Sequence, residues 1–218
     1  MSNYAALKIE AQRVPMFETP VVLARFNNAE GLLTDLETAI RKTMASDEGV
    51  KRSNVGGWHS DTHMLDWGGP AAKTLSEKAI AMAKRLSLFA NASHDDFDWW
   101  CQMWANVSGS GAWNHMHIHP GNLWSAVLYI DMGDEGGAAA EVGGEFYFED
   151  PRFPAAAMHN TRFRYPGADG QAAAWQPELK PKRGDFIMFP AWLRHGVRPY
   201  SGKKERISIA LNVDAIPR

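Results

Sequence analysis

The sequence predicts a mainly β fold, a barrel or a sandwich, with helices from the N-terminal half packed on it. From residue 97 onward, short aromatic or β-branched runs alternate with Gly, Pro and Asn, and no helical pattern separates them. Before residue 97, two segments instead carry apolar residues at helical spacing. The runs that indicate strands are FDWWCQMWANV, AWNHMHIH, LWSAVLYID, GEFYFED, TRFRYP, GDFIMFP and RISIALNV. Consecutive strands without intervening helices are typical of sandwiches and barrels.

The N-terminal half is predicted to hold one short extended segment and two helices. The extended segment is PVVLARF, and the first helix begins at Asn28, with Asn27 or Asn28 as its cap. Its apolar face consists of Leu32, Leu33, Leu36, Ile40 and Met44. The second helix runs from Pro70, which suits a first turn, to about Ala92. Between the helices, SNVGGWHSDTH is predicted to be a loop because of its glycines.

The chain is long enough to bury a sizeable core in one large domain. It has 218 residues, and no linker or internal repeat divides it. We expect a single domain in which residues 1–96 form the helical flank and an entry strand, and residues 97–214 form the β-barrel core.

Composition narrows the range of partners and compartments. A net charge of −2 with mixed signs provides no basic stripe for nucleic acid, and no apolar run approaches membrane-spanning length. We therefore expect neither nucleic acid nor a membrane as a partner. The single cysteine, Cys101, excludes an internal disulfide and suits a reducing compartment, so a cytoplasmic location is predicted. The sequence leaves open whether the chain is a monomer or a homodimer.

Four histidines indicate a metal site. In GAWNHMHIHP, His115, His117 and His119 alternate, so on a strand they would point to the same side, each about 7 Å from the next. His117 and His119 are the preferred pair, because Pro120 would end the strand there and place them at a barrel rim. His195, predicted at the end of the strand GDFIMFP, is the third ligand. His115 is expected beside the site, facing the substrate or supporting the ligands.

A second histidine cluster offers an alternative pair. His59 and Asp61 form a literal His-x-Asp sequence, and His63 follows closely. They lie in the predicted loop ahead of the barrel strands and lack a third ligand at useful spacing. We expect them to cap a helix or to line the entrance of the pocket.

Downstream, one arginine and one hydroxyl suggest an anion receptor. Arg206 and Ser208 lie two residues apart on the predicted strand RISIALNV and therefore share a face. Together they can bind a carboxylate, at a gain of roughly 1.5 to 3 kcal/mol for a charge-assisted hydrogen bond. The alternative is a structural ion pair of Arg206 with Glu205 or Asp185.

Several of these motifs, in this order, resemble one family. The sequence is similar to the iron(II) and 2-oxoglutarate-dependent oxygenases, in a branch with an H-x-H-P turn, and the resemblance covers most of residues 50 to 213. The matching stretches are SNVGGWHSD, MWANV, HIHPGNLWSAVLYI, GGEFYFEDPR, KPKRGDFIMFPAWLRHGVRPY and ERISIALNV.

The resemblance implies a fold, a cofactor set and roles for particular residues. The fold would be a double-stranded β-helix, a jelly-roll or cupin-like barrel. It implies Fe(II), 2-oxoglutarate as co-substrate and dioxygen, and oxidation, most simply hydroxylation, of a small molecule or a peptide with release of succinate and carbon dioxide. The implied iron ligands are His117, His119 and His195. The implied 2-oxoglutarate contacts are Arg206, Ser208, Tyr129 and Asn106.

Two questions remain open at this point. The wider superfamily carries Asp or Glu where this chain has His119, so a carboxylate from Glu145, Asp150 or Asp61 is an alternative third ligand. GAWNHMHIH also fits the first cupin motif, but Leu123 or Trp124 stands where a cupin has glutamate. A cupin enzyme that does not use 2-oxoglutarate is thus one rival, and a non-catalytic jelly roll that binds a sugar or a protein is another.

Overall fold

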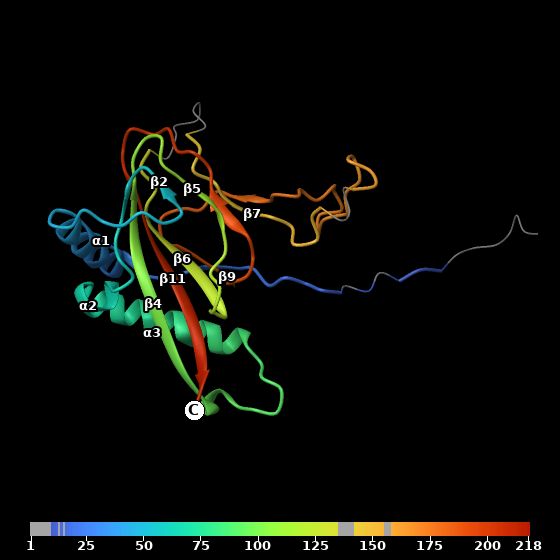
Figure 1. Ribbon diagram of the computed structural model, residues 1–218, viewed down its shortest axis with the longest axis horizontal. Coiled ribbons are helices and arrows are strands. Elements are labelled where there is room, and N and C mark those ends of the chain that lie inside the picture. Colours follow the sequence, from blue (N-terminus) through green and yellow to red (C-terminus); the bar gives the residue numbers. More distant parts are fainter. Residues whose placement is uncertain (1–9, 13, 15, 135–141, 155–157) are drawn as a thin grey trace, which may run out of the picture.

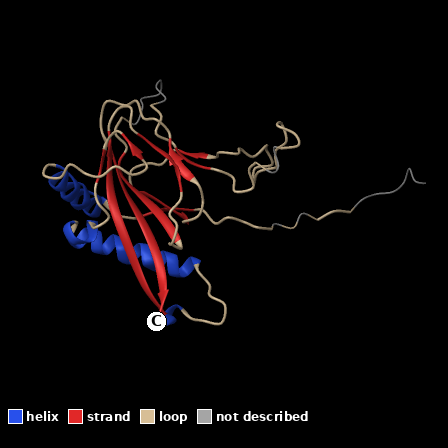
Figure 2. Ribbon diagram, in the orientation of Figure 1, coloured by secondary structure: helices blue, strands red, loops and turns tan. Residues whose placement is uncertain are grey.

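Two antiparallel sheets form a double-stranded β-helix, and helices cover the outer face of the larger sheet (Figures 1 and 2). The computed structural model describes residues 10–12, 14, 16–134, 142–154 and 158–218. The prediction of a mainly β barrel with helices packed on it is confirmed.

The larger sheet has six strands and contains the longest pairing in the molecule. Its order is β1 (Val22–Arg25), β9 (Asp185–Pro190), β6 (Trp124–Asp131), β11 (Arg206–Pro217), β4 (Phe97–Ser108) and β3 (Trp58–His59). The central strands β4 and β11 are each 12 residues long and pair over their whole length. Such a ladder fixes the register of every side chain along it.

The smaller sheet has five strands, all short. Its order is β2 (Asn54–Val55), β5 (Trp113–His117), β10 (His195–Val197), β7 (Phe146–Phe148) and β8 (Glu178–Leu179). Between the two sheets lies a mainly aromatic core of Val127, Tyr129, Phe146, Phe148, Ile187, Phe189 and Leu193. This core packs between the sheets, and four of its members, Val127, Tyr129, Phe146 and Phe189, also line a cavity there.

Three helices close the opposite face of the larger sheet: α1 (Glu30–Met44), α2 (Met64–Trp67) and α3 (Gly69–Leu86). The helix α3 packs on β4 and β11, and α1 packs on α3 and β6. The predicted stripe of α1 is confirmed, since Leu33, Leu36 and Ile40 are fully buried. A single 3₁₀ turn, η2 (His94–Asp96), precedes β4. No helix in the described part of the chain is both long and apolar enough to cross a membrane.

The predicted helix ends are partly wrong. The residue at the N-cap of α1 is Ala29, without a side-chain cap, because Asn28 adopts a left-handed backbone (φ 54°) that turns the chain instead. The helix α3 ends at Leu86 rather than near Ala92. Ser87 has an extended backbone there, and its hydroxyl donates to the Ala83 carbonyl and accepts from the Trp124 indole.

The predicted strand pattern also needs two corrections. SNVGGWHSDTH contains β2 and β3, one in each sheet, because Gly56 and Gly57 (φ 66° and 71°) let the chain pass between the sheets. TRFRYP forms no strand beyond one isolated bridge at Pro166. Its aromatic residues pack locally instead, and Arg152 lies over the Tyr165 ring at 4.7 Å. The alternating aromatic residues of TRFRYP therefore gave the sequence pattern of a half-buried strand, although no strand forms there.

Candidate active site

Three histidines converge at one end of the barrel, between the sheets. His117 is the last residue of β5 and faces His195, the first residue of β10, across the smaller sheet. His119 lies two residues beyond β5. One coordinating nitrogen from each ring lies within 4.8 Å of the other two, and the centroids of the His117 and His195 rings are 4.4 Å apart. This separation suits three ligands of a single ion.

Backbone carbonyls determine which ring nitrogens are available. Nδ1 of His117 lies 2.6 Å from the carbonyl oxygen of His115, and Nδ1 of His195 lies 2.8 Å from that of Leu193. Because a carbonyl only accepts, both Nδ1 atoms carry the proton and donate it. Each Nε2 therefore keeps a free lone pair, which is the usual arrangement of metal-binding histidines.

Burial keeps the three rings neutral. Desolvation lowers the pKa of His117, and lowers that of His119 to about 4, with the His117 ring as a second cause. Desolvation also lowers the pKa of His195, which is almost fully buried among Phe146, Phe148 and Phe189. Neutral imidazoles are the form that binds a cation, so the site is ready for a metal near neutral pH.

The alternation expected for the histidine run holds only in part. His115 is exposed, packs on the Trp113 ring at 4.2 Å and does not line the cavity. The pairing of β10 with β5 slips between His195 and Val197, which faces Asn114, so β5 carries an extra residue at this point. Such a bulge changes the face on which the preceding residues lie, and Asn114 lines the cavity instead of His115.

The positions of His119 and His195 relative to their strands also differ from the prediction. β5 ends at His117, because the N–H of His119 donates to the carbonyl of Ala191, just beyond β9 in the other sheet (2.9 Å). His195 does not end the strand GDFIMFP. That strand stops at Pro190, and a turn leads to the separate strand β10.

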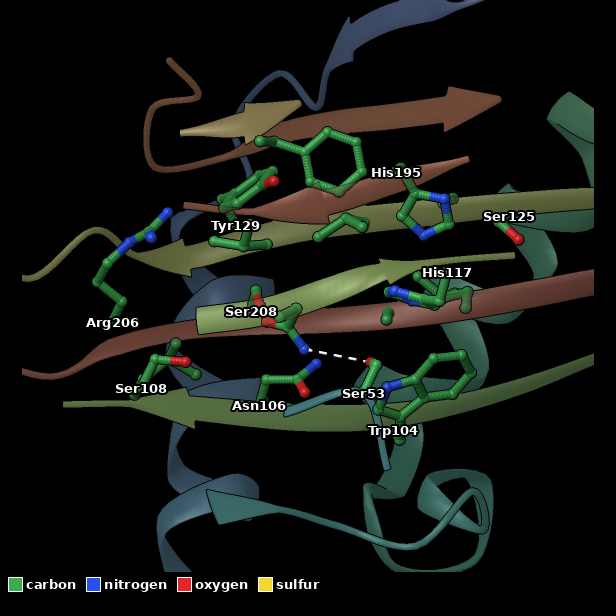
Figure 3. Close-up of a pocket in the computed structure, with 18 of the residues that line it drawn as sticks. Ser53, Trp104, Asn106, Ser108, His117, Ser125, Tyr129, His195, Arg206 and Ser208 are labelled. Carbon is green, nitrogen blue, oxygen red and sulfur yellow. Dashed lines mark hydrogen bonds between the residues drawn. The ribbon is translucent and has the colours of Figure 1, made fainter. Parts of the chain in front are cut away.

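Three of the four predicted co-substrate residues lie in one row on the larger sheet. Asn106, Ser208 and Tyr129 face one another across β4, β11 and β6. Arg206 stands two residues before Ser208 on β11, and all four line the same cavity as the three histidines. Figure 3 shows Arg206 at one end of this cavity, His117 and His195 at the other, and Tyr129 and Ser208 between them.

Arg206 is a buried cation that faces this cavity. It is 9% exposed, its guanidinium lies 5.3 Å from the centre of the Tyr200 ring, and burial lowers its pKa. In the described residues no ion pair involves Arg206. The two alternative partners are occupied elsewhere, since Asp185 pairs with Arg25 (2.5 Å) and Glu205 pairs with Arg41 (3.1 Å). An anion in the cavity would offset the desolvation of this guanidinium, and a dicarboxylate could provide one.

The candidate carboxylate ligands are not part of the histidine cluster. Asp61 binds His63 (3.1 Å), Asp150 binds Arg152 (2.6 Å), and Glu145 lies 3.9 Å from Lys180. Within the described ranges, the group of residues that could hold a metal ion consists of the three histidines alone.

The His59 pair is also outside the histidine cluster. Asp61 accepts the backbone N–H of His63, the N-cap residue of α2, but no side chain caps this helix, so the expected capping role is not found. His59 is buried and stacks on Trp104, with ring centroids 5.8 Å apart.

Among the further residues that line the cavity and that sequence reasoning did not select are Ser53, Trp104 and Ser108. Trp104 and Ser108 alternate with Asn106 on β4, so period two could have identified both. Trp104 packs on His119 with ring centroids 5.5 Å apart. Ser53 comes from the segment before β2 and accepts a hydrogen bond from the Asn114 amide (3.4 Å). No local pattern marks it.

A family model described as "Putative 2OG-Fe(II) oxygenase" matches residues 102–212, slightly more than half of the chain. The chain belongs to the 2OG-Fe(II) oxygenase family. The matched span includes all seven predicted site residues. The protein is therefore an enzyme, a dioxygenase that depends on iron(II) and 2-oxoglutarate, and the cupin and non-catalytic alternatives are set aside. No protein with a curated description gives a significant sequence match.

Solved structures share the fold of this 2OG-Fe(II) oxygenase. A prolyl-4-hydroxylase from Pseudomonas putida is 16% identical with a TM-score of 0.53, over 92% of this chain and 94% of that one. A Trichoplax adhaerens prolyl hydroxylase, in complex with a hypoxia inducible factor peptide fragment, is 14% identical with a TM-score of 0.60, over 89% and 83%. HygX from Streptomyces hygroscopicus, with nickel and 2-oxoglutarate bound, is 12% identical with a TM-score of 0.57, over 90% and 83%.

Proposed function

We propose that His117, His119 and His195 hold the iron, that Arg206 and Ser208 hold the distal carboxylate of 2-oxoglutarate, and that the enzyme hydroxylates a small molecule or a peptide. The observation that carries this proposal is the buried Arg206. It shares a cavity with a cluster of neutral imidazoles, and no described carboxylate pairs with it. A co-substrate with a chelating end and a carboxylate end matches the two ends of this cavity.

Each residue has a role in this proposal that follows from its position. Nε2 of His117 and of His195 would bind the metal, because each Nδ1 is committed to a carbonyl. Arg206 would provide paired hydrogen bonds, and the Ser208 hydroxyl one more. Burial raises the pKa of Tyr129, so its hydroxyl stays protonated and can donate. Asn106, next to Ser208 in the row, offers an amide to the same ligand.

Bound iron and 2-oxoglutarate together would supply the oxidising chemistry. In the overall reaction, dioxygen, 2-oxoglutarate and a C–H bond of the substrate become succinate, carbon dioxide and an alcohol. The protein contributes ligand geometry and exclusion of water. Phe146 and Phe189 pack on the His195 ring at 5.5 and 4.6 Å and shield that side of the site.

The all-histidine site has an electrostatic consequence. Three neutral imidazoles add no negative charge, so a bound Fe²⁺ would keep its full charge toward the open positions. That charge should strengthen the attraction for an anionic co-substrate compared with a site that contains a carboxylate.

The test is succinate formation from 2-oxoglutarate with iron and dioxygen, first without substrate and then with pools of metabolites and peptides. Proline-containing peptides are the first pool, because two proteins of similar fold are prolyl hydroxylases. Under anaerobic conditions, 2-oxoglutarate added to the iron protein should produce a weak visible charge-transfer band. Absence of the band at saturating 2-oxoglutarate would count against the proposed site.

A further inference from the structure

Two chain segments pair with each other beside Arg206. Residues 142–145 run antiparallel to residues 198–201, and Gly144 N–H donates to the Pro199 carbonyl (3.1 Å). This paired segment closes the end of the barrel beside the guanidinium. Gly144 adopts a left-handed backbone, with φ of 79°.

The space that a side chain would fill at Gly144 is already occupied. A Cβ built there would overlap Nη1 of Arg206 and lie 2.8 Å from its Cζ. The guanidinium thus packs directly against the backbone of Gly144. Real Cβ atoms do not approach other atoms this closely, so a side chain at this position would force the guanidinium to move.

Tyr200 limits the directions in which the guanidinium could shift. The Tyr200 ring, 5.3 Å from the Arg206 Cζ, is held at both ends. Its backbone bonds to Gly111 and Ala112, and its buried hydroxyl donates to Lys204 and accepts from Asp134 (2.8 Å each). The ring is therefore a fixed neighbour, and the position of the guanidinium depends on the room left at Gly144.

We propose that Gly144 is a positioning residue for the co-substrate: the absence of a side chain there sets the orientation in which Arg206 meets the distal carboxylate. The inference rests on the proposed role of Arg206. It adds a glycine outside the binding row as a determinant of affinity for 2-oxo acids that carry a second carboxylate.

The experiment compares the binding of two ligands across a set of variants. Binding of 2-oxoglutarate and of 2-oxobutanoate, which lacks the distal carboxylate, is measured anaerobically on the iron protein. Gly144→Ala should weaken 2-oxoglutarate binding by tenfold or more, as expected when a charged hydrogen bond is lost. Its 2-oxobutanoate binding and iron content should stay within about twofold of wild type, so the preference for 2-oxoglutarate falls.

Gly170→Ala is the matched control. Gly170 has a similar backbone angle, φ of 75°, but a Cβ there would meet nothing within 4 Å, and Gly170 does not line the cavity. It therefore reports the cost of backbone strain alone and should keep the preference for 2-oxoglutarate. Equal loss of preference in both alanine variants would overturn the proposal.

A double variant tests whether the effect passes through Arg206. Arg206→Lys removes the Nη1 atom that the new Cβ would meet, so adding Gly144→Ala to it should change 2-oxoglutarate binding by less than about twofold. A full further loss would overturn the proposal. If Gly144→Ala alone does not fold, folding of the double variant supports the clash with Arg206, and failure of both overturns it. If Arg206→Ala leaves 2-oxoglutarate binding unchanged, the proposed function fails instead, independently of Gly144.

Discussion

The two ends of the active-site cavity are built in different ways. The Arg206 end lies on β6, β11 and β4, long neighbouring strands of the larger sheet, where Asn106, Ser208 and Tyr129 form one register row. The histidine end depends on the short strands β5 and β10 of the smaller sheet and on the residues just beyond β5. One end is a regular ladder, and the other is an assembly of strand ends.

This difference determines how each end should respond to a substitution. In a ladder, backbone pairing on both sides holds a side chain in place, so removing one contact should affect only the ligand that it binds. At strand ends, each histidine is held by a few local bonds, such as the contact of His195 Nδ1 with the Leu193 carbonyl. Losing one ligand there should affect the whole metal site.

His195→Ala should have the largest effect. Its ring lies 4.4 Å from that of His117 and 5.1 Å from that of His119, so its loss leaves two ligands. Iron affinity should fall by about 100-fold or more, since even outer partners of metal ligands contribute 10- to 100-fold. Metal analysis after dialysis measures this, with circular dichroism as the control for folding. Retention of iron by a folded His195→Ala protein would contradict the assignment.

Arg206→Ala should affect one end of the cavity and leave the other end unchanged. We expect 2-oxoglutarate binding to weaken by roughly tenfold or more, because a charge-assisted hydrogen bond contributes about 1.5 to 3 kcal/mol. Iron content should not change, since Arg206 lies at the far end of the cavity from His117 and His195 (Figure 3). Calorimetric titration and metal analysis of the same samples test both statements. Equal loss of iron would show that the ends are not independent.

Ser208→Ala should give a smaller effect of the same kind. A neutral hydroxyl contributes about 0.5 to 1.5 kcal/mol, so 2-oxoglutarate binding should weaken by roughly twofold to tenfold. The neighbouring row residue provides a matched comparison, since Tyr129→Phe also removes one hydroxyl from a position that faces Ser208. A Ser208→Ala loss larger than that of Arg206→Ala would reverse the proposed ranking within the row.

His115→Ala should have the smallest effect and tests the bulge in β5. Because His115 is exposed and packs on Trp113, its removal should leave iron content and 2-oxoglutarate binding within about twofold of wild type. His117→Ala, in the same run, is the control that should lose iron. If both variants lose iron equally, His115 lies closer to the metal than the bulge allows.

Much of the fold was predictable because it follows from local patterns. The apolar stripe of α1 has one clear period, and β4, β6 and β11 lie in aromatic or β-branched runs that are typical of strands. Sequence patterns failed in two situations. TRFRYP alternates like a strand but forms only an isolated bridge, and β2 is only two residues long, too short to show a period. Strands this short form because a partner strand is present.

The sequence by itself determined the chemical types of the site: imidazoles in alternation, a distant fourth histidine, and an arginine with a hydroxyl two residues on. Period two also places Arg206 with Ser208, because the regular strand β11 contains both. Only the tertiary structure decided that Asn114 rather than His115 faces the cavity, that Ser53 joins it, and that Gly144 packs against Arg206. These contacts depend on a bulge and on segments far apart in the chain, and no local periodicity encodes them.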